Sequence, residues 1–205
     1  MPTDLLTLLR QHSLDHQTAA DPNEAEMTAR TIAFVEANPN CLDRSLLEGH
    51  ITGSAWITSS ESAPGGSPDG VQVLLIHHRK LDRWFQPGGH ADGDPDIAAV
   101  ALREAEEETE LPDIRLVSPA IFDVDIHVIP AKGDGSAGAV PEHLHYDIRF
   151  LFTASNNGPL GGESREVKAI RWVSLDEAEK LSNSESISRM IRKTIRAGIM
   201  ADKQV

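Results

Sequence analysis

The chain has 205 residues, 40% of them hydrophobic and 25% charged, which is enough apolar sequence to bury a globular core. A formal net charge of −13 argues against binding to nucleic-acid polymers, although a bound cation would still admit a small phosphorylated substrate. The lone Cys41 excludes a disulfide within the chain. No apolar run approaches the roughly 18 residues of a membrane span, and the first residues do not resemble a secretory leader. We therefore expect a cytoplasmic protein with no membrane association.

Residues 1–48 are expected to form a helical extension, with a second domain over residues 49–205. Leu5, Leu8 and Leu9 share one face of a short helix. The pair Asp21-Pro22 predicts the start of a second helix, which runs to about Ala37. No chemistry is indicated in this extension, and it is a candidate element for a homodimer.

The following segment changes from helical to strand-like patterns. Strands are predicted over Ile51–Thr58 and Val71–His77, and Trp84–Gly89 is predicted to be a strand end that breaks into a tight turn. A helix is then predicted to run to about Thr109, with Asp94 as its N-cap and the following proline at its first position.

Two later segments alternate clearly between apolar and polar residues, so each predicts a strand with one polar face. The polar residues are Asp123, Asp125 and His127 in the first segment and His143, His145, Asp147 and Arg149 in the second. A further strand is predicted over Lys168–Val173, and a capping box at Ser174 to Glu177 predicts a short helix. Isoleucines at 187, 191, 195 and 199 predict an amphipathic C-terminal helix. Together these elements predict an α/β/α sandwich with a mixed sheet.

The predicted helix that ends near Thr109 carries an acidic run. Glu104 lies three residues before Glu107 and four before Glu108, so the three carboxylates share about a third of the helix circumference. Arg103 is four residues before Glu107 and is placed to orient it. Such a cluster suits a hard cation with oxygen ligands, Mg²⁺ or Mn²⁺. The spacing alone also fits a solvated acidic face.

The stretch from Gly89 to Leu111 resembles the signature of the Nudix family, G-x5-E-x7-R-E-U-x-E-E-x-G-U, where U is apolar. The matching residues are Gly89, Arg103, Glu104, Glu107, Glu108 and Leu111, with Ala105 as a small apolar residue. Two positions depart from the signature: Pro95 stands at the family's first glutamate and Glu110 at its late glycine. A side chain at the latter position would cost about 1 kcal/mol if the left-handed backbone is kept.

The resemblance implies a Nudix-type fold and a metal-dependent pyrophosphohydrolase. Its substrate would be a nucleoside diphosphate derivative such as a nucleotide sugar, a dinucleotide or a nucleotide. Glu104 and Glu108 would be the principal metal ligands, with Glu107 as a third and a backbone carbonyl at Gly88 or Gly89 completing the set. Glu166 is the candidate general base, with Glu163 as the alternative. The departures at Pro95 and Glu110 leave open a nucleotide-binding or sensor protein with weak or no catalysis.

The polar strand faces allow three interpretations. They are an exposed sheet face, a substrate pocket, or a second transition-metal site through His143 and His145. As a pocket, the candidate substrate-binding residues are His90, Asp125, His127, His143, His145 and Arg149, with the arginine binding a phosphate.

Overall fold

The computed structural model describes residues 4–15, 20–59, 70–132, 140–161 and 167–201. It divides into two compact units. Unit 1 is formed by Met1–Ser54, Gly88–Ala101 and Pro119–Phe150, and unit 2 by Ala55–Pro87, Leu102–Ser118 and Leu151–Val205. None of the helices in the described ranges is long and apolar enough to span a membrane.

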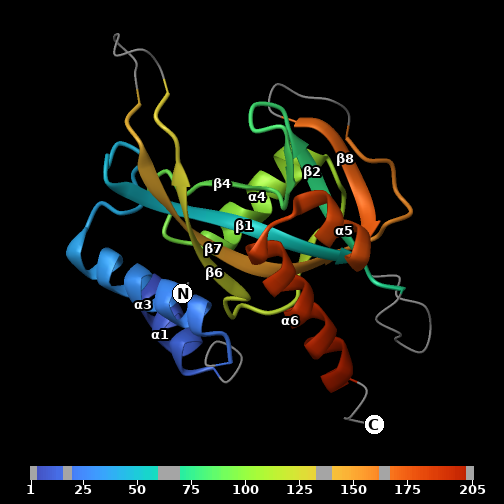
Figure 1. Cartoon of the computed structure of the whole chain (residues 1–205), viewed down its shortest axis with the longest axis horizontal. Coiled ribbons are helices and arrows are strands. Elements are labelled where there is room, and N and C mark those ends of the chain that lie inside the picture. Colours follow the sequence, from blue (N-terminus) through green and yellow to red (C-terminus); the bar gives the residue numbers. More distant parts are fainter. Residues whose placement is uncertain (1–3, 16–19, 60–69, 133–139, 162–166, 202–205) are drawn as a thin grey trace. The chain divides into compact units, whose positions relative to one another are not determined.

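Unit 1 contains the two N-terminal helices, α1 (Leu5–Leu14) and α3 (Pro22–Ala37), which lie side by side in Figure 1. The bounds of α3 agree with the predicted helix from Asp21-Pro22 to about Ala37. The Asp21 carboxylate caps α3 by accepting from the backbone N–H groups of Asn23 and Glu24, and Pro22 occupies the first helical position. The buried face of α3 packs against strand β6 (Asp123–Ile129).

Buried polar contacts fix α3 against β6. The Glu24 side chain is fully buried, and its Oε1 accepts from the Val124 backbone N–H at 3.3 Å and lies 2.9 Å from His12 Nε2 of α1. Phe34 of α3 stacks on Tyr146 with ring centroids 3.9 Å apart. The N-terminal helices are therefore held to the strands of unit 1 by specific side-chain contacts as well as by apolar burial.

The strands of unit 1 pair in two ladders. β6 pairs antiparallel with β7 (His143–Ala154), which sets Asp123 opposite Arg149, Asp125 opposite Asp147 and His127 opposite His145. β4 (Gly88–His90) pairs antiparallel with β1 (Gly49–Ser59), and His90 faces Thr52 there. The pairing of β6 with β7 thus brings the two polar strand faces together.

Unit 2 is built around β2 (Gln72–His78). Val73, Leu74 and Leu75 of this strand are fully buried, as expected for the centre of a sheet. β3 (Arg83–Phe85) and β8 (Val167–Ser174) both pair antiparallel with β2, and β5 (Arg115–Leu116) pairs with the end of β7. In this unit the hydrogen-bonded order is β3-β2-β1-β7-β5.

The sheet is mixed, as predicted, because β1 and β7 run in the same direction. In unit 1 the Leu144 N–H donates to the Glu48 carbonyl near the start of both strands. In unit 2 the Thr58 hydroxyl donates to the Phe152 carbonyl near their ends.

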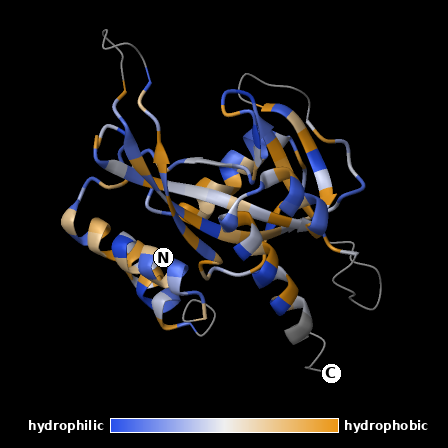
Figure 2. Ribbon diagram, in the orientation of Figure 1, coloured by the Kyte–Doolittle hydropathy of each residue, from blue (hydrophilic) through white to orange (hydrophobic). Residues whose placement is uncertain are grey.

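Two C-terminal helices complete unit 2, α5 (Leu175–Ser182) and α6 (Glu185–Ala201). The predicted capping box is present, with the Glu177 N–H donating to the Ser174 hydroxyl at 3.2 Å. Ile187 and Ile191 of α6 are buried, and Figure 2 shows hydrophobic and hydrophilic bands on this helix. The Trp56 indole N–H donates to the Thr194 hydroxyl of α6 at 2.9 Å. The elements form an α/β fold with a mixed sheet, as predicted.

The start of helix α4 (Ile97–Thr109) differs from the prediction. Asp94 is not its N-cap. The N-cap is Asp96, two residues further along the chain, whose carboxylate accepts from the Ala99 N–H at 3.1 Å. Asp94 accepts from the Asp96 N–H and closes the preceding turn, in which Asp92 and Gly93 have positive φ. Because the carboxylate of Asp94 is bound within the turn, Asp96 caps the helix instead.

Candidate functional site

Close contact with β1 positions the first turn of α4. A Cβ atom added to Gly53 would lie 2.8 Å from the Ile97 carbonyl oxygen and 3.2 Å from the Ala101 nitrogen. Only glycine lets the helix approach the strand this closely. Ile97, Val100 and Ala101 are buried and supply the apolar face of this turn.

The acidic run lies on the second half of α4, in unit 2. Glu104 and Glu108 are half-buried, whereas Glu106 and Glu107 are exposed. Arg103 forms an ion pair with Glu104, with its Nη2 at 3.2 Å from Oε1, while the sequence suggested Glu107 as its partner. The helix therefore presents three carboxylates at the expected three- and four-residue spacing, and one cation beside them.

A left-handed residue ends α4, as the signature requires. Glu110 has φ 54° although it is not glycine. The Thr109 carbonyl accepts from the Gly161 N–H at 2.8 Å, and a Cβ atom at 161 would lie 2.7 Å from that oxygen. The turn of the family signature is thus retained despite the departure at this position.

We predict that Glu110→Gly raises the free energy of unfolding by about 1 kcal/mol, because glycine carries no Cβ penalty in the left-handed region. Urea unfolding followed by tryptophan fluorescence measures the change. Glu110→Ala is the matched control: it removes the same carboxylate but keeps the Cβ atom, so it should give no such gain. Equal stabilisation by both variants would contradict the strain at this residue.

The glycines before α4 belong to unit 1. Gly88 faces Ser54 and Gly89 faces Gly53 in the β4–β1 ladder. A Cβ atom at Gly88 would overlap the Ser54 hydroxyl. The predicted backbone metal ligand at Gly89 remains a prediction, since this residue and the carboxylates of α4 lie in different units.

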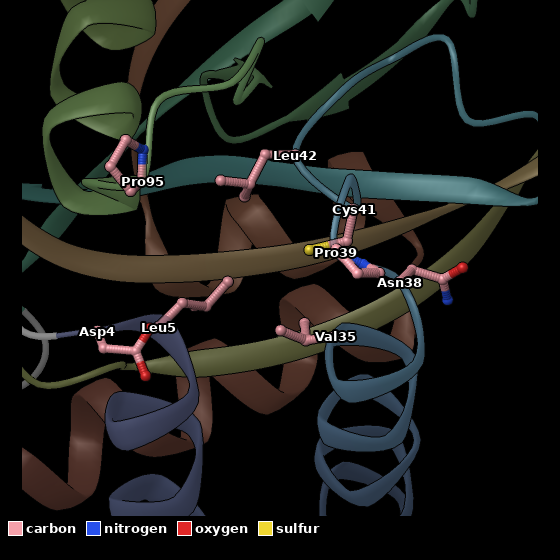
Figure 3. A pocket seen from close by; sticks show the side chains of 8 residues that line it. All are labelled: Asp4, Leu5, Val35, Asn38, Pro39, Cys41, Leu42 and Pro95. Atoms are coloured by element: carbon pink, nitrogen blue, oxygen red, sulfur yellow. The ribbon is translucent and has the colours of Figure 1, made fainter.

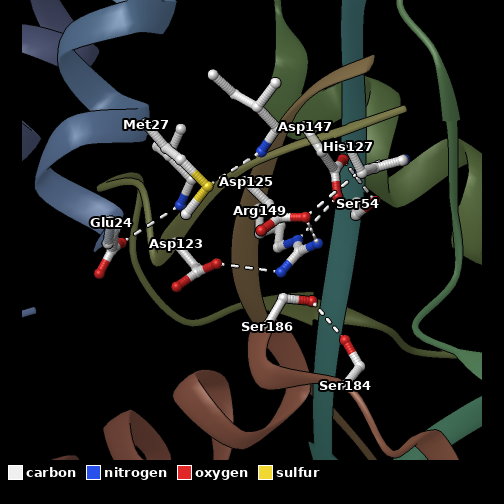
Figure 4. Close-up of polar contacts among 12 residues, drawn as sticks. Glu24, Met27, Ser54, Asp123, Asp125, His127, Asp147, Arg149, Ser184 and Ser186 are labelled. Atoms are coloured by element: carbon white, nitrogen blue, oxygen red, sulfur yellow. Dashed lines mark hydrogen bonds and ion pairs between the residues drawn. The ribbon is translucent and has the colours of Figure 1, made fainter. Parts of the chain in front are cut away.

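Arg149 lies at the centre of a buried charge cluster. Its guanidinium contacts the carboxylates of Asp123 at 3.1 Å, Asp125 at 3.0 Å and Asp147 at 2.8 Å, as Figure 4 shows. Burial lowers the pKa of Arg149, but the carboxylates of Asp125, Asp147 and Asp123 outweigh it, and the pKa is raised overall. The Asp147 carboxylate also accepts from the hydroxyls of Thr52 and Ser54.

This cluster changes the interpretation of the polar strand faces. The exposed-face interpretation is wrong for Asp123, Asp147 and Arg149, which are at most 2% exposed. A phosphate could reach Arg149 only by displacing a carboxylate from it, so the geometry disfavours the predicted phosphate contact. The cluster is better explained as an electrostatic link between β6 and β7.

Five histidines of unit 1 also gather, from strands β1, β4, β6 and β7. The ring centroids of His50, His90, His143 and His145 are 4.8–5.3 Å apart in the pairs that are in contact, and His127 lies 5.4 Å from His145. Burial lowers the pKa of His90 to about 4 and that of His145 to about 2. Arg44 and the neighbouring histidines add to the first shift, and the neighbouring histidines add to the second. These two imidazoles are therefore neutral at pH 7.

His50 was not singled out from the sequence. It stands one residue before the predicted strand at Ile51–Thr58 and was therefore not assigned to a strand face. Its position beside the other histidines also depends on which strands pair with β1, which the sequence does not show. The signal available was its two-residue spacing from Thr52, which puts both on one face if the strand is extended by one residue.

The candidate general bases, Glu163 and Glu166, lie outside the described residues.

A pocket of about 220 Å³ lies in unit 1 between the N-terminal helices and the loop before β1 (Figure 3). Its lining residues include Leu5, Cys41 and Pro95 and none of the predicted site residues, and it is smaller than typical ligand pockets.

A family model described as the NUDIX domain matches residues 55–194. The chain belongs to the Nudix family. It is therefore a Nudix pyrophosphohydrolase. The family membership predicted from the acidic helix is confirmed.

Individual relatives agree with this assignment. The asymmetrical bis(5'-nucleosyl)-tetraphosphatase of Rattus norvegicus is 27% identical over 119 residues, which cover 58% of this chain and 70% of that protein. A binary complex of the C. elegans Ap4A hydrolase has a TM-score of 0.50 at 16% identity and covers 74% of this chain and 98% of that chain. At this identity, the second comparison supports the Nudix fold alone.

Proposed function

We propose that this Nudix protein is a metal-dependent hydrolase that cleaves the diphosphate linkage of a nucleoside diphosphate derivative. The observation that carries the proposal is the arrangement of Glu104, Glu107 and Glu108 on α4. Three carboxylates within one third of a helix repel one another. Arg103 offsets part of this repulsion, and a divalent cation would offset the rest.

The donor set fits a hard cation. Carboxylate oxygens are the ligands that Mg²⁺ and Mn²⁺ prefer, and the half-buried Glu104 and Glu108 would lose less conformational freedom on binding than exposed side chains. We assign these two as principal ligands and the exposed Glu107 as a third or water-mediated ligand. Gly89 is retained as the proposed backbone ligand. When bound, the metal polarises phosphoryl oxygens and lowers the pKa of an attacking water.

The chain's own residues would position the metal and remove the proton. Arg103 holds the Glu104 carboxylate through its ion pair and so acts as a positioning residue. Glu166 remains the proposed general base. His90, His127, His143 and His145 remain proposed substrate contacts, and they are in contact with one another or with His50.

The names of the relatives guide the choice of substrates to test. The rat relative's name puts dinucleoside tetraphosphates first among the candidates, followed by nucleotide sugars and nucleoside triphosphates. The test is a panel of these three classes with Mg²⁺, Mn²⁺ and Zn²⁺ compared, with products separated by chromatography. We expect kcat/KM for one class to exceed that for the others by at least about tenfold.

The alternative is a Nudix-fold sensor that binds a nucleotide without turnover. Its support is the pair of departures at Pro95 and Glu110. The left-handed backbone at Glu110 weakens this support, because the turn after the acidic helix is kept. Tight binding with no turnover across the whole panel would favour the sensor over the hydrolase.

A further inference from the structure

The histidine cluster of unit 1 contains ligand atoms close enough to share one ion. Ring nitrogens of His50, His90 and His145 all lie within 4.8 Å of one another. They come from three strands, β1, β4 and β7, whose pairing fixes their backbones. Zinc bound at 2.0–2.1 Å by imidazoles in a tetrahedron separates its ligand atoms by about 3.4 Å. Small rotations of the three rings would reach that spacing.

Buried nitrogens in this cluster have no hydrogen-bond partner among the described residues. The Nε2 atom of His145 is in this state, and neither ring nitrogen of His50 makes a hydrogen bond of good geometry, although the Leu46 backbone carbonyl lies near its ring. His50 is 3% exposed, so solvent does not satisfy it. Burying an imidazole without a partner is costly, and a ligand that accepts its lone pair would remove this cost.

A fourth imidazole, that of His143, lies beside these three, although its nitrogens are outside the group of atoms that lie within 4.8 Å of one another. The Nδ1 atom of His143 lies 2.9 Å from the Pro141 carbonyl, which fixes Nδ1 as the protonated donor and leaves Nε2 with a free lone pair. Histidines that bind metals usually donate their other N–H to such an oxygen. The His143 ring stacks on His50, with centroids 5.0 Å apart.

We propose that His50, His90 and His145 bind one transition-metal ion of the zinc type, with His143 as the fourth ligand. The site goes beyond the proposed hydrolase function: in it, His90, His143 and His145 bind a metal ion in place of the substrate contacts proposed above. None of its residues belongs to the acidic cluster of α4. Within unit 1, Gly53 faces the first turn of α4, so by alternation along β1 His50 and Thr52 point to the opposite face of the sheet.

The ligand chemistry selects the class of ion. Neutral imidazoles suit Zn²⁺, Co²⁺ and Ni²⁺, whereas Mg²⁺ and Mn²⁺ prefer carboxylates, carbonyls and water. Asp125, which lies 3.4 Å from His127, already contacts Arg149, so the proposed ligand set contains no carboxylate.

The test is titration of the chelator-treated full chain with Co²⁺ in the presence of excess Mg²⁺, which saturates oxygen-ligand sites. We expect one equivalent of Co²⁺ to bind, with the visible absorption of a tetrahedral nitrogen site, and Zn²⁺ to displace it. His50→Gln and His145→Gln should weaken binding by at least about 100-fold. His77→Gln, which alters a histidine of β2 in unit 2, is the matched control and should bind like the wild type.

Two further variants guard against misfolding of the His50 variant and against confusion with the hydrolase site. His90 is only half-buried, so His90→Gln should fold even if the His50 variant does not, and it should also lose the ion. Glu108→Gln should still bind one equivalent, which separates this site from the hydrolase site without any measurement of turnover. Binding of less than one equivalent by the wild type, or unchanged binding by His90→Gln, would overturn the proposal.

Discussion

Replacing Glu108 with glutamine should lower kcat by at least about 100-fold, which corresponds to about 2.7 kcal/mol of transition-state stabilisation. Glutamine keeps the size of the side chain and its hydrogen-bonding capacity but removes the charge that a hard cation requires. Glu108 is half-buried on α4, on the same face as Glu104. The measurement is the initial rate of substrate hydrolysis at saturating substrate, with Mg²⁺ varied.

The matched control for this variant is Glu106→Gln on the same helix. Glu106 is exposed and points away from the shared face of Glu104, Glu107 and Glu108, so its loss should change kcat by less than about threefold. Equal thermal stability of the two variants would exclude unfolding as the cause of any difference. A loss under threefold for Glu108→Gln would mean that the metal is held elsewhere.

Replacing Arg149 with methionine should lower the free energy of unfolding by about 3–5 kcal/mol. Methionine fills much of the same volume but leaves the carboxylates of Asp123, Asp125 and Asp147 without their common cation. Breaking a buried ion pair from one side leaves uncompensated buried charge, which is the costly case. Urea unfolding at pH 7, followed by the fluorescence of the three tryptophans, measures the loss.

Arg171→Met is the matched control for the arginine variant. Arg171 pairs with Glu177 at 2.7 Å, but both side chains are at least 40% exposed. Exposed pairs contribute about 0–1 kcal/mol, so the control should be nearly neutral. Similar losses in both variants would show that the cluster around Arg149 is not a major source of stability.

The sequence predicts the elements better than the contacts of the polar residues. The start of helix α3 was predictable because Asp21 and Pro22 act on the backbone within one turn. The polar face of β7 was also predictable, because alternation is local. The buried ion pairs of Arg149 were not predictable, because the three carboxylates come from two strands and their burial depends on the packing around them.

The candidate site shows the same limit. The spacing of Glu104, Glu107 and Glu108 follows from helix geometry, so their shared face needs no tertiary information. His50 lies 40 residues before His90 and 95 before His145, and only the β4–β1 pairing and the direction of β7 bring them together. Asp96 replaced Asp94 as the N-cap because the preceding turn had its own requirement for a side-chain acceptor.

We propose that the acidic helix of this Nudix protein supports metal-dependent cleavage of a diphosphate bridge. The most direct test follows mononucleotide release from a dinucleoside tetraphosphate by the full chain, first with Mg²⁺ or Mn²⁺ and then with excess chelator. We expect release with either metal and none with the chelator, together with loss of release in Glu108→Gln. Release that persists undiminished in the chelator, or nucleotide binding without release under every metal condition, would contradict the claim.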